Sequence, residues 1–117
     1  LKRFSLLCAQ GAADARGLSR QLLGAAPQPQ TATLLAGLDL LANLDTRTSL
    51  QTFAGPQLHL FAGADALVPA SAAQALLELL PDVEVGLIDN ASHAFALERP
   101  HEIAAAIQAF LHEAGDD

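Results

Sequence analysis

The sequence of 117 residues has no methionine, tryptophan or tyrosine, and it has a single cysteine, Cys8. One cysteine excludes an internal disulfide and is typical of a reducing compartment. The chain also lacks an apolar run of about 18 residues, which excludes a membrane-spanning helix, and its apolar N-terminal stretch is too short for a signal peptide. Together these absences predict a cytoplasmic protein.

Metal-binding motifs are missing as well. The four histidines are scattered along the chain, and neither His-x-x-x-His nor Cys-x-x-Cys occurs. Zinc sites in proteins depend on ligand spacings of this kind. The sequence therefore predicts no metal site.

The lack of methionine includes the first position, which is Leu1. A translated chain normally begins with methionine, so we expect these residues to be part of a longer protein. Apolar residues make up 51% of the sequence, which is enough to bury a core. The length allows at most one small domain.

Positive charge is scarce and unevenly placed. Six lysines and arginines stand against thirteen acids, for a formal net charge of −7. Residues 1–20 hold four cations and one acid, which gives +3, whereas the rest of the chain holds two cations and twelve acids, which gives −10. A basic patch on an acidic protein is a candidate docking surface for an anionic partner. The alternative interpretation is a solvated helix face.

The first half of the chain is predicted to be helical, because apolar residues recur at helical spacing. The predicted helices span residues 1–10, 14–23 and 31–43. Gly11 and a linker at residues 24–30 separate them, and residues 45–55 are expected to be a connector. The first helix is expected to present a face made of Phe4, Leu7 and Cys8. The third is expected to bury a stripe made of Leu34, Leu35, Leu38 and Leu41.

In the second half the pattern changes to alternating strands and helices. Two short apolar runs predict strands at residues 57–61 and 83–88, and helices are predicted at residues 71–80 and 100–113. This order implies a right-handed crossover and parallel pairing, as in an α/β fold. Two parallel strands cannot cover their own faces and edges. We therefore expect the rest of the sheet to be absent from this chain or supplied by another copy.

An acid and a histidine each follow one of these predicted strands. Asp65 lies in the turn after the first, and His93 lies in the loop after the second. The carboxyl ends of parallel strands meet at one edge of a sheet, so we expect the two side chains to be close. An acid there can accept the imidazole Nδ1–H and leave Nε2 free to take a proton from a nucleophile. Taken singly, Asp65 has a second interpretation as a turn residue or helix N-cap, and His93 as a loop histidine bonded to backbone.

No nucleophile accompanies the pair. The nucleophile elbow Gly-x-Ser-x-Gly does not occur, and its nearest approach, at residues 17–21, lacks the second glycine and follows no strand. Ser92 is rejected, because adjacent residues in a loop rarely point at each other. In hydrolases of this kind the serine precedes the acid and the histidine. We therefore expect the serine upstream of Leu1, together with the early strands and the oxyanion donors.

Residues 63–69 (Gly-Ala-Asp-Ala-Leu-Val-Pro) and 91–94 (Ala-Ser-His-Ala) resemble the C-terminal end of the α/β-hydrolase superfamily. A closer resemblance covers nearly the whole chain. Four stretches are similar to the lid and return segment of the BioH-type pimeloyl-[acyl-carrier protein] methyl ester esterases. They are residues 3–11 (Arg-Phe-Ser-Leu-Leu-Cys-Ala-Gln-Gly), Ala15-Arg16 with Arg20, residues 37–41 (Gly-Leu-Asp-Leu-Leu) and residues 45–47 (Asp-Thr-Arg).

For the fold, this resemblance implies the C-terminal part of an α/β-hydrolase with an incomplete sheet. Residues 1–48 would be a helical lid, and residues 49–117 would hold the last two parallel strands and their helices. For the site, the resemblance makes Asp65 the catalytic acid and His93 the catalytic base, with His93 also contacting substrate. The other substrate-binding residues would be Phe4, Ser5, Leu6, Leu7 and Cys8. The residues that would bind the acidic carrier protein are Arg3, Arg16 and Arg20.

The activity that the resemblance implies is hydrolysis of the methyl ester of pimeloyl-[acyl-carrier protein] in biotin synthesis. A serine activated by His93 would carry it out, and no cofactor is expected. Neither a nucleic acid nor a membrane is expected as a partner. Two alternatives stay open: a general α/β-hydrolase for small esters or lactones, and a binding module without the nucleophile. The parent enzyme is expected to be a monomer. This chain alone is expected to be inactive, and to self-associate or pair with its missing N-terminal half.

Overall fold

The computed structural model describes residues 1–25 and 28–115. Ala26 and Pro27, which belong to the expected linker, lie outside the described residues. The described part is a mixed α/β structure, as predicted. Its helices are α1 (Lys2–Ala9), α2 (Ala15–Ala25), α3 (Thr31–Asn43), α4 (Arg47–Thr52), α5 (Ser71–Leu79), α6 (Phe95–Glu98) and α7 (Pro100–Gly115). Its strands are β1 (Leu58–Ala62) and β2 (Glu84–Ile88).

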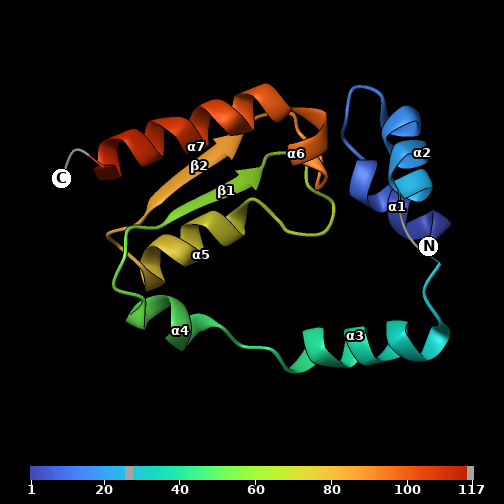
Figure 1. Cartoon of the computed structure of the whole chain (residues 1–117), viewed down its shortest axis with the longest axis horizontal. Helices are drawn as coiled ribbons and strands as arrows, with labels where there is room; N and C mark the ends of the chain where they lie inside the picture. The colour runs from blue at the N-terminus through green and yellow to red at the C-terminus, as the bar shows by residue number, and fades with distance from the viewer. Residues whose placement is uncertain (26–27, 116–117) are drawn as a thin grey trace.

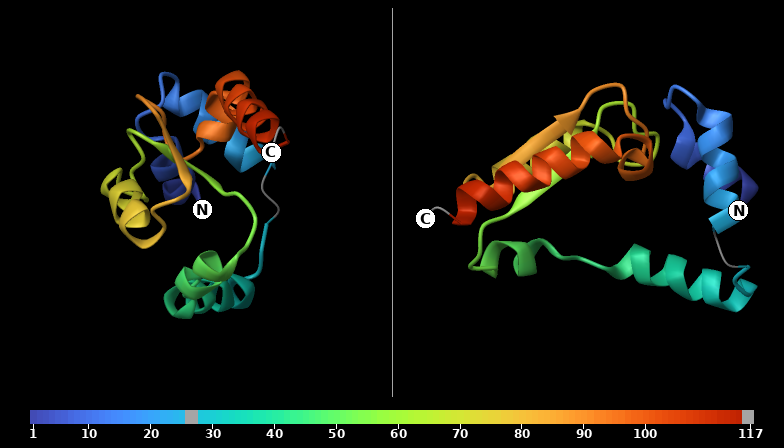
Figure 2. Two further views of the ribbon diagram at one scale, coloured as in Figure 1. Left: turned by 90° about the vertical axis from the view of Figure 1, so that its left-hand side faces the viewer. Right: turned by 45° about the horizontal axis from the view of Figure 1, so that its top comes forward.

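The two strands form a parallel sheet in which Leu58 pairs with Glu84 and Ala62 pairs with Ile88. The predicted parallel pairing is therefore confirmed. Figures 1 and 2 show α5 and α7 on opposite faces of this pair of strands. Both strands run in the same direction and end level with each other. The loops that follow Ala62 and Ile88 consequently leave the same edge of the sheet.

A small buried core lies at that edge. Ala62, Ile88 and Ala91 are buried, and Phe95 and Ile103 pack against them. Two of the three buried residues are alanines, so α6 and the start of α7 can approach the ends of the strands closely. Apolar burial is the main driving force of folding. This cluster therefore holds the two loops at the carboxyl edge in place relative to each other.

Helices α1 and α2 pack against each other as a hairpin beyond the carboxyl ends of the strands (Figure 1). The hydroxyl oxygens of Ser5 and Ser19 lie 2.9 Å apart and share a buried hydrogen bond between the two helices. A buried hydroxyl is costly without a partner, so each serine satisfies the other. The small side chains at this contact also let the two helices approach closely.

The hairpin is fastened to the loops of the sheet at two points. The N–H of Ala94 donates a hydrogen bond to the carbonyl oxygen of Cys8, with the two atoms 3.1 Å apart. Gly11, at a φ of +94°, lies so close to Ala64 that a Cβ placed on it would be 2.7 Å from the Ala64 Cβ. These contacts bring the first helices of the chain to the loops that follow β1 and β2.

The stripe on α3 that was expected to be buried is exposed. Leu35 is 61% exposed, Leu38 is 62% exposed and Leu41 is 70% exposed. Figures 1 and 2 show α3 set apart from the sheet, and no element of the described residues packs closely on it. The prediction was wrong because helical spacing identifies an apolar face but does not supply the partner that covers it.

Two further expectations about the helices need correction. Residues 45–55 were expected to be a connector, but they contain α4, and the short α6 was not predicted. The buried residues of α1 are Ser5, Cys8 and Ala9, whereas Phe4 and Leu7 are exposed. The buried face of α1 consists of small residues, because α2 and the loop that carries Ala94 approach this face closely. Among residues 1–25 and 28–115, none of the helices has the length and apolar character that a bilayer span requires.

Candidate active site

Asp65 and His93 are in contact at the carboxyl edge of the sheet. The Nδ1 atom of His93 lies 3.0 Å from Oδ2 of Asp65 and 3.1 Å from Oδ1. Asp65 lies three residues after the end of β1, and His93 lies five residues after the end of β2. The level ends of the two parallel strands bring these loops together, although the residues are 28 positions apart in the sequence.

Backbone groups hold the carboxylate of Asp65 in one orientation. Its Oδ1 accepts the N–H of Leu67 at 2.8 Å and the N–H of Val68 at 2.9 Å. Its side chain is only 5% exposed, whereas that of His93 is 37% exposed. Burial by itself would raise the pKa of Asp65. The two N–H donors and His93 outweigh that effect, so the pKa of Asp65 lies below its usual value.

This arrangement combines both interpretations of Asp65. Oδ1 accepts hydrogen bonds from the turn backbone and also lies 3.1 Å from His93 Nδ1, and Oδ2 lies 3.0 Å from the same nitrogen. An ionised carboxylate accepts hydrogen bonds but donates none, so it favours the tautomer of His93 with its proton on Nδ1. The Nε2 atom has no hydrogen-bond partner among the described residues. That nitrogen is available to accept a proton from a group outside them.

Backbone hydrogen bonds tie the loop of His93 to its surroundings, and sequence reasoning did not find them. The N–H of Gly63 donates to Ile88 at 2.8 Å, and the N–H of Ala64 donates to Ala91 at 2.9 Å. Asn90, between these two acceptors, has a φ of +57°. Asparagine tolerates this left-handed conformation better than most residues. Hydrogen bonds between main-chain atoms leave no pattern in the side chains, so only the conformation of Asn90 had a possible signal in the sequence.

The lowered pKa of Asp65 predicts acid-sensitive stability. The carboxylate contributes stability above its unfolded pKa of about 3.9, and this contribution is lost as the pH falls through the lower folded pKa. We expect the wild type to exceed Asp65→Asn in free energy of unfolding at about pH 6, and the difference to shrink at about pH 3. Urea unfolding measures it, with the exposed Asp82→Asn as control. A difference that is the same at both pH values would contradict the prediction.

No serine of the described residues forms a hydrogen bond with the His93 ring. Ser92 is fully buried, and its hydroxyl has no hydrogen-bond partner in the described part of the chain. Ser19, in the nearest approach to an elbow sequence, is buried against Ser5. Neither hydroxyl forms a hydrogen bond with His93. The site therefore contains an acid and a base in contact, without the third member of a triad.

The five residues expected to line a substrate pocket point in different directions. A hollow of about 590 Å³ separates α1 from α3, and its lining residues are Leu1, Phe4, Thr33, Leu34, Gly37, Leu38 and Leu41. Of the expected residues, Phe4 lines this hollow, whereas Ser5 and Cys8 are buried and Leu6 lines another groove. A helix turns by about 100° per residue, so five consecutive residues cannot face one cavity.

Two of the three expected carrier-binding arginines share one groove. This groove, of about 210 Å³, lies on the α1–α2 hairpin and is lined by Lys2, Leu6, Arg16, Ser19, Arg20 and Leu23. Arg16 and Arg20 are four residues apart on α2, so they lie on one face of the helix. Arg3 is exposed on α1 and is not among the residues that line the groove. The groove thus has an apolar floor with three cations around it.

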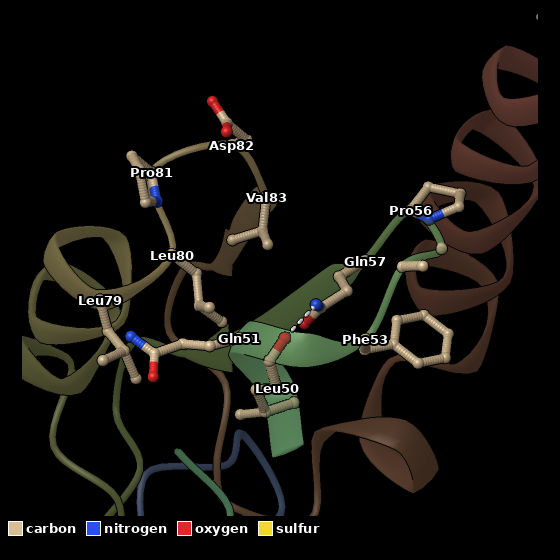
Figure 3. A pocket seen from close by; sticks show the side chains of 12 residues that line it. Leu50, Gln51, Phe53, Pro56, Gln57, Leu79, Leu80, Pro81, Asp82 and Val83 are labelled. Atoms are coloured by element: carbon tan, nitrogen blue, oxygen red, sulfur yellow. Dashed lines mark hydrogen bonds between the residues drawn. The ribbon is translucent and has the colours of Figure 1, made fainter. Parts of the chain in front are cut away.

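A different hollow, of about 500 Å³, lies at the amino ends of the strands (Figure 3). Figure 3 shows Gln57 reaching toward Leu50, whose carbonyl oxygen accepts a hydrogen bond from the Gln57 Nε2 at 2.8 Å. Asp82 is the one ionisable side chain in the lining of this hollow. The hollow is at the opposite end of the strands from His93, so it is not part of the candidate site. Within residues 1–25 and 28–115, no group of three or more His, Cys, Asp or Glu side chains is arranged to hold a metal ion.

Comparison with known proteins gives relatives over nearly the whole chain, although no family model matches. The chain is 37% identical over 110 residues to the biotin biosynthesis bifunctional protein BioHC of Cellvibrio japonicus, covering 94% of this chain and 22% of that protein. It is 39% identical over 97 residues to the pimeloyl-[acyl-carrier protein] methyl ester esterase of Vibrio cholerae, covering 80% of this chain and 38% of that protein.

The esterase of the same name from Vibrio parahaemolyticus is 34% identical over 116 residues, covering 97% of this chain and 46% of that protein. The chain thus spans less than half the length of these relatives. Identities between 34% and 39% over most of the chain indicate common descent. Over nearly its whole length, therefore, this chain is homologous to a part of the pimeloyl-[acyl-carrier protein] methyl ester esterases.

Proposed function

We propose that this chain supplies the acid and the base of a serine carboxylesterase that hydrolyses the methyl ester of pimeloyl-[acyl-carrier protein] in biotin synthesis. The observation that carries the proposal is the contact between His93 Nδ1 and the buried Asp65 carboxylate at the carboxyl edge of a parallel sheet. Homology to part of the esterases named for this substrate supports the reaction class. In this proposal residues 1–48 form the lid and residues 49–117 form part of the hydrolase core.

The reaction would be acyl transfer to water. His93 Nε2 accepts the proton of a serine hydroxyl, held on a segment outside these residues, as the serine oxygen attacks the ester carbonyl carbon. Methanol leaves with that proton, and an acyl-enzyme ester remains. His93 then takes a proton from water, whose oxygen attacks the acyl carbon, and the serine leaves with the proton. Asp65 keeps the ring in one tautomer and stabilises the imidazolium formed in both steps.

The lid offers one feature for each end of the substrate. The hollow beside Phe4 is lined by apolar side chains, which suits an alkyl chain. The groove that holds Arg16 and Arg20 suits an acidic carrier protein, because guanidinium groups pair well with carboxylates and phosphate. Most of the remaining charge on the chain is negative, so the hairpin is the face that would attract an anionic partner.

The proposal also covers the assembly of the chain. The sheet of the described residues has two strands, and many large apolar side chains are exposed, among them Leu38 and Leu41 on α3. Surfaces of this kind mark contacts with other protein. We expect the 117-residue chain to be inactive alone, and to pair with another copy or with the segment that bears the serine. A chain that is monomeric by light scattering and that unfolds cooperatively would argue against this expectation.

Charge reversal on α2 tests the substrate. In a full-length enzyme that carries this chain, we expect Arg16→Glu/Arg20→Glu to raise KM for carrier-bound pimeloyl methyl ester by about 10- to 100-fold, because two attractive contacts become repulsive. Hydrolysis of a free short methyl ester should be unchanged. Steady-state kinetics with both substrates measure the effect.

The matched control is Arg47→Glu. Arg47 is exposed and is paired with Asp45 at 2.6 Å, away from the hairpin. If the hairpin variant lowers only the carrier-bound reaction and the control lowers neither, the arginines bind the carrier. If both reactions stay unchanged in the hairpin variant, the basic groove is a solvated face, and the chain belongs to a general esterase for small esters.

A further inference from the structure

The carboxylate of Glu98 lies in the interior beside the loop that carries His93. Its side chain is 10% exposed, and its Oε1 accepts the N–H of Ser92 at 2.8 Å. Its Oε2 has no hydrogen-bond partner in the described residues. Burying a carboxylate is unfavourable unless hydrogen bonds compensate. The hydrogen bond from the Ser92 N–H is therefore one that compensates the burial of this acid.

The next residue in the sequence binds the other end of the same loop. The Nη2 atom of Arg99 lies 3.4 Å from the carbonyl oxygen of Asp89 and 3.3 Å from that of Asn90. Its Nε lies 3.8 Å from the Glu98 carboxylate, and its Nη1 bonds to the exposed Glu102. Two adjacent side chains thus hold residues 89–92 at both ends. Asn90, whose φ is +57°, lies within this stretch.

His93 lies between two anchored backbone amides. The amide before it, of Ser92, is bound by Glu98, and the amide after it, of Ala94, is bound by the carbonyl oxygen of Cys8. Its ring meets Asp65 at 3.0 Å, an ordinary distance for an N–H···O hydrogen bond. A rotation or shift of the backbone at Ser92 moves the ring away from that geometry. A displacement of about 1 Å in a catalytic group lowers rates by about 100-fold.

We infer that Glu98 is a positioning residue, whose hydrogen bond to the Ser92 amide fixes the loop and so holds the His93 ring against Asp65. The inference rests on the proposed role of His93 as the base. Sequence reasoning passed over Glu98 because no strand end or histidine motif includes it. It acts through the backbone of Ser92 and makes no hydrogen bond to His93 in the described residues.

Two conservative substitutions separate the hydrogen bond from the charge. Glu98→Gln keeps an oxygen at the same reach and loses the charge, whereas Glu98→Asp keeps the charge and is one methylene too short to reach Ser92. The control is Glu102→Gln, on the exposed side of Arg99. Each variant is made in a ¹⁵N-labelled full-length enzyme that carries this chain. The measurements are the exchange rate of the Ser92 amide and the ¹⁵N shifts of the His93 ring, which report the proton on Nδ1.

We expect Glu98→Gln and Glu102→Gln to match the wild type. In Glu98→Asp, Ser92 exchange should rise about tenfold, as for the loss of an ordinary hydrogen bond, and the His93 ring should lose its single Nδ1–H form. The inference would be overturned if Glu98→Asp kept the wild-type Ser92 exchange rate and His93 ring ¹⁵N shifts. It would also be overturned if Glu98→Gln lost the ¹⁵N shifts of the Nδ1–H form of His93. Neither readout needs a substrate. A full-length enzyme that hydrolyses no ester would therefore refute the proposed function without affecting this result.

Discussion

Asp65→Asn, made in a full-length enzyme that carries this chain, is expected to lower kcat for methyl ester hydrolysis by about 10⁴-fold and to leave KM nearly unchanged. The cause is the hydrogen bonding of the carboxylate. Oδ1 of Asp65 already accepts two backbone N–H groups, from Leu67 and Val68. An asparagine must place its carbonyl oxygen there, and its NH₂ group then faces His93.

That NH₂ group donates a hydrogen bond to Nδ1, so the proton of the ring moves to Nε2. A protonated Nε2 cannot accept the proton of a serine, and the base is lost although its position is kept. The control is Asp82→Asn, since Asp82 is exposed at the opposite end of the strands. Steady-state kinetics on a free methyl ester measure the loss. An Asp65→Asn enzyme with more than about one tenth of the wild-type kcat would show that His93 does not depend on this carboxylate.

The second large effect is expected on stability, from Gly11→Ala. Gly11 has a φ of +94°, and a Cβ there would lie 2.7 Å from the Cβ of Ala64 and 2.8 Å from its carbonyl oxygen. The left-handed conformation costs about 1–2 kcal/mol for a residue with a Cβ, and overpacking costs about 1–3 kcal/mol more. We expect the free energy of unfolding to fall by about 2–5 kcal/mol, measured by urea denaturation.

The matched control for this substitution is Gly24→Ala. Nothing lies within 4 Å of a Cβ at Gly24, which belongs to α2. Alanine is the better helix former there, so stability should be unchanged or rise by up to about 1 kcal/mol. The Ala94 amide gives a local readout, because its hydrogen bond to Cys8 joins the hairpin to the loop of His93. Gly11→Ala with wild-type stability and a protected Ala94 amide would contradict the close contact.

The strands and most helices could be predicted because their signals are local. Short apolar runs identified β1 and β2 to within one residue at each end, and the sequence of elements implied parallel pairing, which the structure confirms. The contact between Asp65 and His93 could be anticipated for the same reason. Each follows a strand, and parallel strands deliver their following loops to one edge.

Other features could not be predicted, because they depend on what each surface meets. Apolar spacing marked a face on α3, but Leu38 and Leu41 are exposed. Residues 4–8 were expected to line one substrate pocket. The turn of α1 instead distributes them among the hollow between α1 and α3, the interior of the α1–α2 hairpin and the basic groove on that hairpin. Glu98 gave no signal, since its partner is a backbone amide. Contacts of these kinds join groups that no sequence pattern relates.

By itself the sequence determined the mixed α/β class, the order of its strands and the identity of the acid and histidine that follow them. These depend on the periodicity of apolar residues and on the few residues that interrupt it, all within short stretches of chain. Tertiary structure alone decided that the Asp65 carboxylate bonds both the turn backbone and His93, how the hairpin meets Ala64 through Gly11, and that Glu98 holds Ser92. Those outcomes depend on differences of a few tenths of an ångström in the distances between segments far apart in the chain. Such distances are set only when the elements pack.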